Sequence, residues 1–238
     1  MTDKLYWLDS YVKVFDARIV RAAGNLLVLD RSAFYPAGGG QPNDRGRLTI
    51  NGVDYSVIDL KKEGEDIVHV LDREAAAKPG DAVKGAIDWD YRYACMRYHT
   101  ALHTIDGILE TVYKSGSITG GQIYPDRARI DVDMPDASKD KITEVLERTN
   151  TFAKEGHNIS IREISADEAA RTSNLSRTEP GRELLKKLKT VRVVEIEGLD
   201  VQADGGTHVR NTREIGRIVL SNYENKGAKR KRIEIILE

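Results

Sequence analysis

The sequence predicts an α+β protein: a small N-terminal β-barrel over residues 1–88, then an α+β domain over residues 89–238 with a central antiparallel sheet and a metal-carrying helix. Five or six short segments rich in β-branched and aromatic residues, separated by turn residues, predict the barrel. A long apolar-periodic segment with two histidines four residues apart predicts the helix. The strand-like and helix-like segments beyond it mix without strict alternation, which is typical of α+β folds.

The composition indicates a globular cytoplasmic protein. Of the 238 residues, 40% are hydrophobic and 32% are charged, and no apolar run reaches the roughly 18 residues of a membrane span. The first residues lack the basic segment followed by an apolar one that marks a signal peptide. Cys95 is the single cysteine, so we expect no internal disulfide and a reducing compartment.

Turn residues divide the first domain into short strands. We expect strands at 11–20, 25–30, 48–50, 53–55, 67–71 and 83–87. Asn51-Gly52 predicts a tight hairpin of type I′, because both residues tolerate a positive φ. Residues 78–81, Lys-Pro-Gly-Asp, predict the turn before the last strand.

A glycine-rich loop lies inside this domain at residues 34–44, with the sequence FYPAGGGQPND. Three successive glycines expose backbone N–H groups and permit close approach of a ligand. A flexible connection between strands is the alternative, but the flanking aromatic residues favour a shaped loop. Neither phosphate-loop pattern fits, because no Lys-Ser/Thr follows the glycines.

The predicted helix spans residues 89–114 and is apolar nearly all round, which indicates a buried helix. His99 and His103 are four residues apart, so their side chains share one face about 6 Å apart. Both imidazoles can then bind one ion. A histidine in such a helix is more often a hydrogen-bonded core residue, and the spacing of the pair favours the metal site. The glycine-rich residues 115–121 should end the helix.

The remainder of the second domain should add strands and two shorter helices. We expect strands at 128–133, 159–162, 190–197, 215–222 and 232–237, and an amphipathic helix at 139–154. Ser165-Ala-Asp-Glu168 is a capping box that opens a short helix. The strand at 190–197 should lead straight into the loop that contains Asp204.

Asp204-Gly205-Gly206-Thr207-His208 supplies a second pair of ligand-type side chains four residues apart. The two glycines let the loop bend both side chains inward. Together with His99 and His103, Asp204 and His208 would form a tetrahedral site suited to one Zn²⁺. Thr100 follows His99, which excludes the His-Glu-x-x-His of zinc proteases, and the deaminase and zinc-finger patterns are absent. The set matches zinc hydrolases, whose bound water reaches a pKa of about 7.

Positive charge gathers toward the C-terminus. After residue 170, Lys and Arg outnumber Asp and Glu, whereas the reverse holds before it. The excess lies in a predicted helix at residues 182–192 and in the turn at 226–232, Lys-Gly-Ala-Lys-Arg-Lys-Arg. Such clusters can neutralise phosphates. A solvated turn between two strands is the alternative for the second cluster.

Three groups of residues carry a family resemblance. They are His99-x-x-x-His103, the run Gly205-Gly206-Thr207-His208-Val209 with Asn211-Thr212-x-Glu214-Ile215-Gly216, and the glycine-rich segment 29–41. Together they resemble the editing domain of alanyl-tRNA synthetase, which free-standing alanyl-tRNA editing proteins of the AlaX type share. A small barrel before that domain, with no adenylate-forming signature, is similar to the medium AlaX form. Residues 89–238 would then be the editing domain.

The resemblance implies a zinc-dependent hydrolase that cleaves the ester between tRNA(Ala) and a wrong amino acid, serine and also glycine. A pocket sized for alanine cannot exclude glycine and rejects serine only weakly, so a second, hydrolytic sieve is required. The expected partner is tRNA(Ala) carrying Ser or Gly, without a membrane or DNA partner. The sequence leaves both a monomer and a homodimer open.

By the same resemblance, Ser32 and Gln41 belong to the catalytic site. Ser32 stands where the family carries a Thr whose hydroxyl discriminates serine from alanine, and Gln41 would contact the substrate. The candidates for substrate binding are Gly38, Gly39, Gly40, Thr207, Lys229, Arg230 and Lys231. The glycines would approach the aminoacyl end, while the cations, with residues 182–192, would contact the tRNA backbone.

The sequence departs from the family pattern at one of the predicted metal ligands. The family has Cys where this sequence has Asp204, which can bind zinc through oxygen or can orient another ligand from outside. Zinc could activate water or grip the substrate, and the sequence does not separate these roles. Two other functions stay open: a non-catalytic tRNA- or zinc-binding module, and a hydrolase for another aminoacyl-tRNA, as in the related threonyl-tRNA editing domain.

Overall fold

The chain consists of two compact units, Met1–Cys95 and Met96–Glu238. The computed structural model describes residues 1–114, 117–134, 137–172, 175–176, 183, 185, 187–227 and 230–238. The division between the units falls inside the long helix α1 (Trp89–Thr111). Each unit has sheets of its own.

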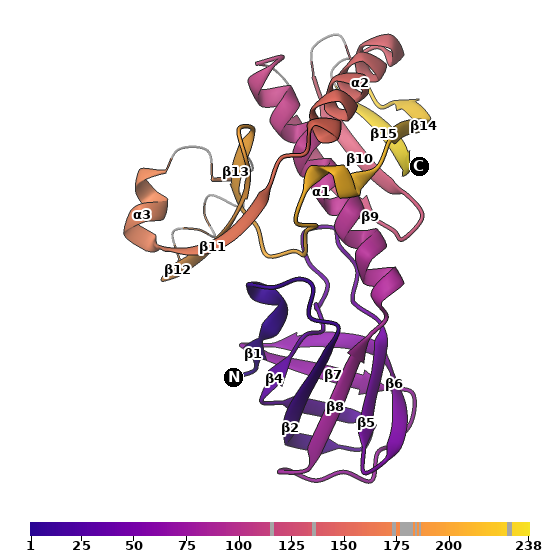
Figure 1. Ribbon diagram of the computed structural model, residues 1–238, viewed down its shortest axis with the longest axis vertical. Coiled ribbons are helices and arrows are strands. Elements are labelled where there is room, and N and C mark those ends of the chain that lie inside the picture. Colours follow the sequence, from indigo (N-terminus) through magenta and orange to yellow (C-terminus); the bar gives the residue numbers. More distant parts are fainter. Residues whose placement is uncertain are drawn as a thin grey trace. The chain divides into compact units, whose positions relative to one another are not determined.

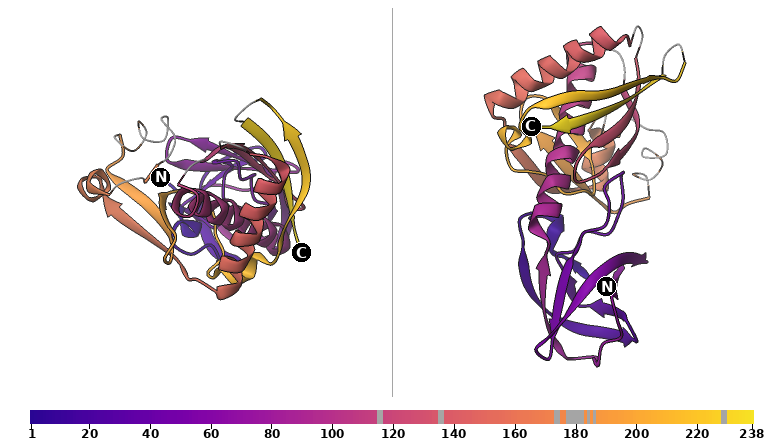
Figure 2. Two further views of the ribbon diagram at one scale, coloured as in Figure 1. Left: turned by 90° about the horizontal axis from the view of Figure 1, so that it is seen from above. Right: turned by 90° about the vertical axis from the view of Figure 1, so that its right-hand side faces the viewer.

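The first unit is a closed barrel of six antiparallel strands, which confirms the small barrel that the sequence predicts (Figures 1 and 2). Around the barrel the strands follow the order β2-β3-β7-β6-β5-β8. They are β2 (Val14–Ala23), β3 (Leu26–Leu29), β5 (Gly46–Ile50), β6 (Val53–Glu63), β7 (Asp66–Leu71) and β8 (Ala82–Ile87). The unit also contains η1 (Leu5–Trp7) and a parallel pair, β1 (Asp3–Lys4) with β4 (Arg31–Ser32).

Alternation along the strands builds the barrel core. In β2 the buried Phe15, Ala17 and Ile19 alternate with exposed residues, as expected for a strand with one face inside. Asn51 and Gly52 join β5 to β6 with φ values of 51° and 78°, the positive values that the predicted type I′ turn requires. The barrel therefore follows directly from period-two patterning and turn chemistry.

The second unit contains two antiparallel sheets, which confirms the α+β architecture. One has the order β14-β15-β10-β9 and the other β11-β12-β13. Their strands are β9 (Ser117–Ile123), β10 (Ala128–Asp133), β11 (Ile159–Ser165), β12 (Thr190–Ile196), β13 (Asp200–Ala203), β14 (Ile218–Asn225) and β15 (Arg230–Leu237). The helices after α1 are α2 (Lys139–Glu155), α3 (Ala166–Arg171) and the 3-10 helix η2 (Thr212–Ile215) (Figure 1).

Helix α2 supports the site from the side of η2. The Ser138 side chain caps its N-terminus by accepting from the Lys141 N–H, and Gly156 ends it with a φ of 88°. Its buried face comprises Ile142, Val145, Leu146, Thr149 and Ala153. This face packs against β14 and η2, so burial of apolar surface holds η2 in place.

Three boundaries differ from the sequence-based expectation. Residues 117–123 form β9 and not only the end of the helix, because their backbone pairs with β10 across Gly120 and Gly121. The strand β12 does not run straight into the Asp204 loop, since β13 intervenes and pairs back onto β12. Ile215, expected in a strand, ends η2.

Every helix in the part of the chain that the structure describes is too short or too polar to cross a membrane.

Candidate metal centre

The structure brings the four predicted ligand residues together. His99 and His103 come from successive turns of α1, while Asp204 and His208 lie in the loop after β13. One ligand atom of each residue lies within 4.8 Å of those of all the others. The ring centroids of His99 and His208 are 4.4 Å apart, and that of His103 lies 5.1 and 4.9 Å from them. Three imidazoles and a carboxylate therefore converge.

Burial sets the protonation states in this cluster. The side chains of His99 and His208 are 5% and 0% exposed, and that of Asp204 is 14% exposed. Burial holds the pKa of His99 well below its ordinary value and lowers the pKa of His208 to about 4. Burial alone would raise the pKa of Asp204, but the neighbouring His99, His208 and His103 hold it well below its usual range. Neutral imidazoles and an ionised carboxylate are the forms that bind a metal.

The Asp204 carboxylate is oriented by two neighbours. The Gly206 N–H donates to Oδ2 at 2.6 Å, and His208 Nε2 lies 3.0 Å from the same oxygen. Arg192 of β12 donates through Nη1 to the Asp204 backbone carbonyl at 2.7 Å and lies 3.8 Å from Oδ2. The Arg192 side chain is only 1% exposed, so a buried cation stands beside the buried carboxylate and fixes the loop that carries it.

Thr100 fixes the orientation of the His208 ring. Its hydroxyl oxygen accepts from the Val209 N–H at 3.3 Å and lies 3.1 Å from His208 Nδ1. Because Nδ1 faces Thr100, the other ring nitrogen, Nε2, faces Asp204. Metal-bound histidines are commonly held in this way through the nitrogen that does not bind the metal.

An acidic network lies beside His103. Its Nδ1 is 3.9 Å from Asp200 Oδ2, and Gln202 Nε2 donates to Asp200 Oδ2 at 2.7 Å and to Asp106 Oδ2 at 3.1 Å. Gly107 of α1 makes this approach possible, since a Cβ at that position would lie 2.7 Å from the Leu199 side chain. The glycine therefore lets the turn between β12 and β13 bring Asp200 next to the helix.

The donor set fits zinc. Bond lengths of about 2.0–2.2 Å to nitrogen and oxygen place tetrahedral ligand atoms roughly 3.3–3.6 Å apart. Asp204 Oδ2 lies 3.0 Å from His208 Nε2, and Asp204 Oδ1 lies 3.7 Å from His99 Nε2. These separations bracket the tetrahedral spacing, and imidazole with one carboxylate is a donor set that zinc prefers.

The motif after His208 fixes the ligand loop to its surroundings. Asn211 and Glu214 form a reciprocal capping box at the start of η2, and Glu214 Oε1 also accepts from the Arg210 N–H at 3.0 Å. Arg97 of α1 donates through Nε and Nη2 to the carbonyls of Glu214 and Ile215, with distances of 2.8–3.1 Å. One guanidinium, two residues before His99, therefore ties the ligand helix to the end of the ligand loop.

We expect Arg97→Gln to weaken zinc binding about 10-fold, as the loss of a group that orients a ligand does. The variant would lose the hydrogen bonds that join the helix carrying His99 and His103 to the end of the loop carrying Asp204 and His208. Competition with a chromophoric chelator measures the affinity. Arg148→Gln is the matched control, because Arg148 pairs with Glu144 on the exposed side of α2. Equal zinc affinity for Arg97→Gln and the wild type would contradict the tethering role.

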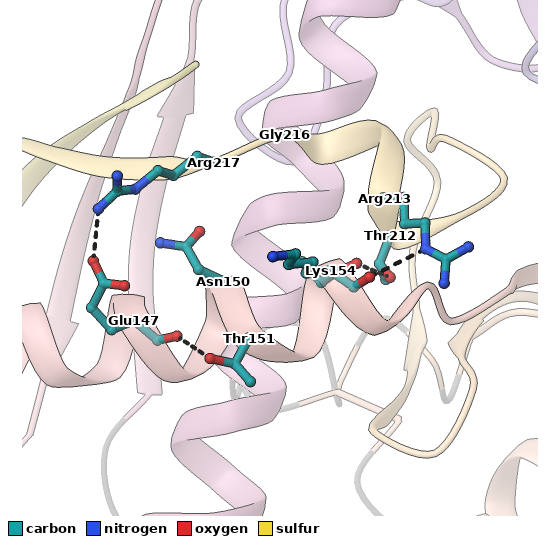
Figure 3. A pocket seen from close by; sticks show the side chains of 9 residues that line it. Glu147, Asn150, Thr151, Lys154, Thr212, Arg213, Gly216 and Arg217 are labelled. Carbon is teal, nitrogen blue, oxygen red and sulfur yellow. Dashed lines mark hydrogen bonds and ion pairs between the residues drawn. The ribbon is translucent and has the colours of Figure 1, made fainter.

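A hollow of about 620 Å³ opens between α2 and η2 (Figure 3). Its lining residues are Glu147, Asn150, Thr151, Ala153, Lys154, Thr212, Arg213, Gly216 and Arg217. Asn150 exchanges two hydrogen bonds with the backbone of Ile218, and Arg213 donates to the carbonyls of Lys154 and Glu155. None of the lining residues belongs to the metal cluster.

Ser32 and Gln41, the predicted catalytic pair of the first unit, are both buried. The Ser32 hydroxyl lies 2.8 Å from His69 Nε2 and accepts from the Phe34 N–H at 3.2 Å. His69 Nδ1 lies 3.3 Å from the Leu27 carbonyl, which can only accept, so the serine hydroxyl donates to Nε2. Burial lowers the pKa of His69 to about 4. The hydroxyl that the resemblance assigns to serine discrimination is therefore held by a neutral histidine.

The glycine-rich loop is a shaped turn anchored by a buried ion pair. Gly38 and Gln41 pair through two backbone hydrogen bonds of 3.1 and 2.9 Å, with Gly39 and Gly40 between them at φ values of 57° and 85°. Only glycine adopts such values readily. At the end of the loop, Asp44 accepts from the guanidinium of the fully buried Arg92.

The predicted tRNA-contacting cations have partners in the structure. Lys231 is buried and donates from Nζ to Asn225 Oδ1 and to the Gly227 carbonyl. Arg230 is exposed and lies opposite Asp133 in the pairing of β15 with β10. Lys229 lies outside the described residues. The described cations of this turn thus face acidic or polar neighbours.

The other predicted basic segment, residues 182–192, needs a correction. The sequence predicts a helix here; Glu183 and Leu185 are helical, Arg182, Leu184 and Lys186 lie outside the described residues, and the end of the segment is a strand. Its last residue, Arg192, belongs to strand β12 and is buried against the Asp204 loop. Strand alternation between Val191 and Val193 would place Arg192 on the opposite, solvated face, so its burial carries no signal in the sequence.

Sequence reasoning also missed several groups around the cluster. Arg97 and Asp200 approach the ligands only through tertiary contacts, and their spacing from the histidines carries no signal. Thr207, a predicted substrate contact, is fully buried beside His208.

Comparison with known proteins defines the class first. A family model described as the second additional domain of threonyl and alanyl tRNA synthetases matches residues 191–234, which include Asp204 and His208. A second model, described as class II (A) tRNA synthetases, matches residues 8–91, which include all six strands of the barrel. The two units are thus similar to parts of tRNA synthetases.

Relatives that match nearly the whole chain define the family more closely. The alanyl-tRNA editing protein AlaX-M of Saccharolobus solfataricus is 40% identical over 98% of this chain and 98% of its own length. The AlaX-M protein of Methanosarcina barkeri is 38% identical over 100% of this chain and 99% of its own. The alanine–tRNA ligase of Metallosphaera sedula is 37% identical over 94% of this chain but only 25% of its own length. The chain belongs to the family of alanyl-tRNA editing proteins of the AlaX-M type.

Proposed function

We propose that the protein is a trans-editing hydrolase that releases serine, and also glycine, from mischarged tRNA(Ala). The observation that carries this proposal is the convergence of His99, His103, Asp204 and His208 within 4.8 Å. Family membership supports the substrate class, since the relatives are named alanyl-tRNA editing proteins. In this proposal residues 1–88 form the barrel domain with the glycine-rich loop, and residues 89–238 form the editing domain.

The reaction is hydrolysis of the ester between the amino acid and the terminal ribose. A zinc ion held by the three histidines, with Asp204 as a fourth ligand or beside it, would supply a Lewis acid; with a coordination position left open, it would also lower the pKa of a bound water toward about 7. Asp204, held by the Gly206 N–H and Arg192, keeps a negative charge in the cluster and orients the neighbouring imidazoles. The low pKa values of His99 and His208 keep their ring nitrogens available as ligands and not as proton donors.

Ser32 and Gln41 are the proposed substrate-discriminating residues, and the glycine-rich loop is the proposed approach to the aminoacyl end. In this proposal Ser32 acts together with His69, because the serine hydroxyl donates to His69 Nε2. Thr207, Lys229, Arg230 and Lys231 complete the proposed substrate contacts. The protein is proposed to act in the cytoplasm.

We expect the wild type to release serine from tRNA(Ala) at least about 100-fold faster than alanine, because a site that hydrogen-bonds a substrate hydroxyl can reject the analogue without it by about 10⁴–10⁵. Release of glycine is also expected, although glycine has no hydroxyl to be read. The measurement is release of labelled amino acid from Ser-, Gly- and Ala-tRNA(Ala) at limiting enzyme. Ser32→Ala removes the hydroxyl and should reduce the preference for serine over alanine, while Ser32→Thr restores it. Equal release of all three amino acids by the wild type would refute editing specificity.

A further inference from the structure

The glycine-rich loop closes onto strand β6 at one end of the barrel. Asn43 Nδ2 donates to Asp59 Oδ1 at 2.6 Å and to the Leu60 carbonyl at 3.2 Å, and its Oδ1 accepts from the Ala37 N–H at 2.5 Å. The loop is thus fastened to the strand by one side chain. The residues of β6 just beyond Leu60 therefore lie next to the glycines.

Lys62 is the residue of β6 that meets the glycines. It is two residues after Leu60, a buried member of the barrel core, so both side chains leave the strand on the same face. Its Nζ lies 3.1 Å from the place that a Cβ on Gly38 would occupy, and the Tyr35 hydroxyl lies 3.2 Å from it. The lysine ammonium therefore covers Gly38, and any larger residue at Gly38 would displace it.

Lys62 is exposed at the surface of β6, and its ammonium still feels its surroundings. Burial lowers its pKa, and the nearby charge of Lys4 lowers it further. Lys4 itself is paired, since its Nζ donates to Glu65 Oε2 at 2.9 Å. Within the described part of the chain, no hydrogen bond or ion pair is found for Lys62 Nζ. Glu65 thus compensates the charge of Lys4, and the charge of Lys62 is left for an anion from outside the described chain.

We propose that Lys62 and the backbone of Gly38–Gly40 form a binding site for a phosphate group of a nucleic acid, namely a phosphodiester of the single-stranded 3′ end of tRNA. This inference rests on the proposed function for the identity of the nucleic acid. A phosphate would supply the missing counter-charge of Lys62. Glycines without side chains let the phosphate approach the backbone closely.

The geometry also accounts for the neighbours of the site. The Tyr35 hydroxyl donates to the Gly38 carbonyl at 2.9 Å, so this backbone acceptor of the loop already has a hydrogen-bond donor. Lys61, the preceding residue on the strand, is exposed like Lys62 and pairs in register with Val68. Successive strand residues point to opposite faces, so Lys61 has the same charge on the other side of the strand.

The test measures binding of a short 5′-labelled RNA that ends in CCA, by fluorescence anisotropy over a range of salt concentrations. We expect Lys62→Gln to weaken binding about 5- to 10-fold and to lower the slope of log K against log salt by about 0.7, the loss of one phosphate contact on a single strand. Lys62→Arg should keep both values near those of the wild type. Lys61→Gln is the matched control. It should leave the slope of log K against log salt unchanged.

Two further arms identify the ligand. Inorganic phosphate should displace the labelled RNA poorly when it is added at the concentration at which unlabelled RNA displaces it. If inorganic phosphate competes as well as the RNA does, the site binds free phosphate and the nucleic-acid assignment is wrong. Binding of the RNA by Lys62→Gln with the wild-type affinity and slope overturns the proposal, as does absence of RNA binding to the wild type. The assay uses uncharged RNA and reads no ester cleavage, so failure of the proposed hydrolysis and failure of this site are distinguishable.

Discussion

His208→Ala is expected to lose the bound metal and to reduce deacylation of mischarged tRNA(Ala) at least about 1000-fold, because a catalytic metal contributes several kcal/mol of transition-state stabilisation. His208 is fully buried and its two ring nitrogens face Thr100 and Asp204. Removing the ring leaves three ligands and breaks the link to Thr100. Metal content by mass spectrometry and single-turnover release of serine measure the two effects.

His157→Ala is the control for that variant. His157 belongs to the same unit, but its ring stacks on Phe152 at a centroid distance of 3.8 Å and faces Glu155. Neither of these neighbours belongs to the metal cluster. It should keep the metal and the activity. A His208→Ala protein that retains full metal content and full release would remove His208 from the ligand set.

Arg92→Met is expected to lower the free energy of unfolding by about 3–5 kcal/mol, the cost of leaving a buried charge without its partner. Arg92 is fully buried and donates to both oxygens of Asp44, to the Ser10 carbonyl at 2.9 Å and to the Ala33 carbonyl at 2.5 Å. Asp44 also accepts from the Tyr35 N–H at 2.6 Å. The pair therefore anchors both ends of the glycine-rich loop, and its loss should loosen the loop as well as the barrel.

Urea unfolding followed by circular dichroism measures the effect. Arg73→Met is the control: Arg73 is about half exposed and pairs with Asp72, so its loss should cost less than about 1 kcal/mol. The double variant Asp44→Asn with Arg92→Met should be less destabilised than Arg92→Met alone, because no unpaired carboxylate remains. Arg92→Met stability equal to that of Arg73→Met would show that the ion pair does not anchor the loop.

The ligand cluster was predictable because its signal is local. His99 and His103 share a helix face by spacing alone, and Asp204 with His208 repeats the spacing on a loop. The Asn51-Gly52 turn was predictable for the same reason. Within each pair the residues are neighbours in the sequence, so the pair needs no knowledge of the fold; the meeting of the two distant pairs in one cluster depends on the fold.

The remaining features depend on pairing between distant segments. β9 contains two glycines, and only its hydrogen bonds to β10 make it a strand. The basic run at 226–232 shows as uncompensated charge in the sequence, yet Arg232 bonds both oxygens of Asp131 on the neighbouring strand. Lys62 likewise becomes notable only when the loop containing Gly38 closes over it. Register and loop closure, which a single sequence does not display, decide these cases.

We propose that this cluster makes the protein a metal-dependent editing hydrolase. The most direct measurement is release of labelled serine from Ser-tRNA(Ala) by wild type and Asp204→Ala, each with a chelator and after zinc is restored. The account predicts release by the wild type that the chelator abolishes and zinc restores, and strongly reduced release by Asp204→Ala. Release unaffected by complete removal of metal, or absence of release from a fully zinc-loaded wild type, would contradict it; the second result would indicate a binding module.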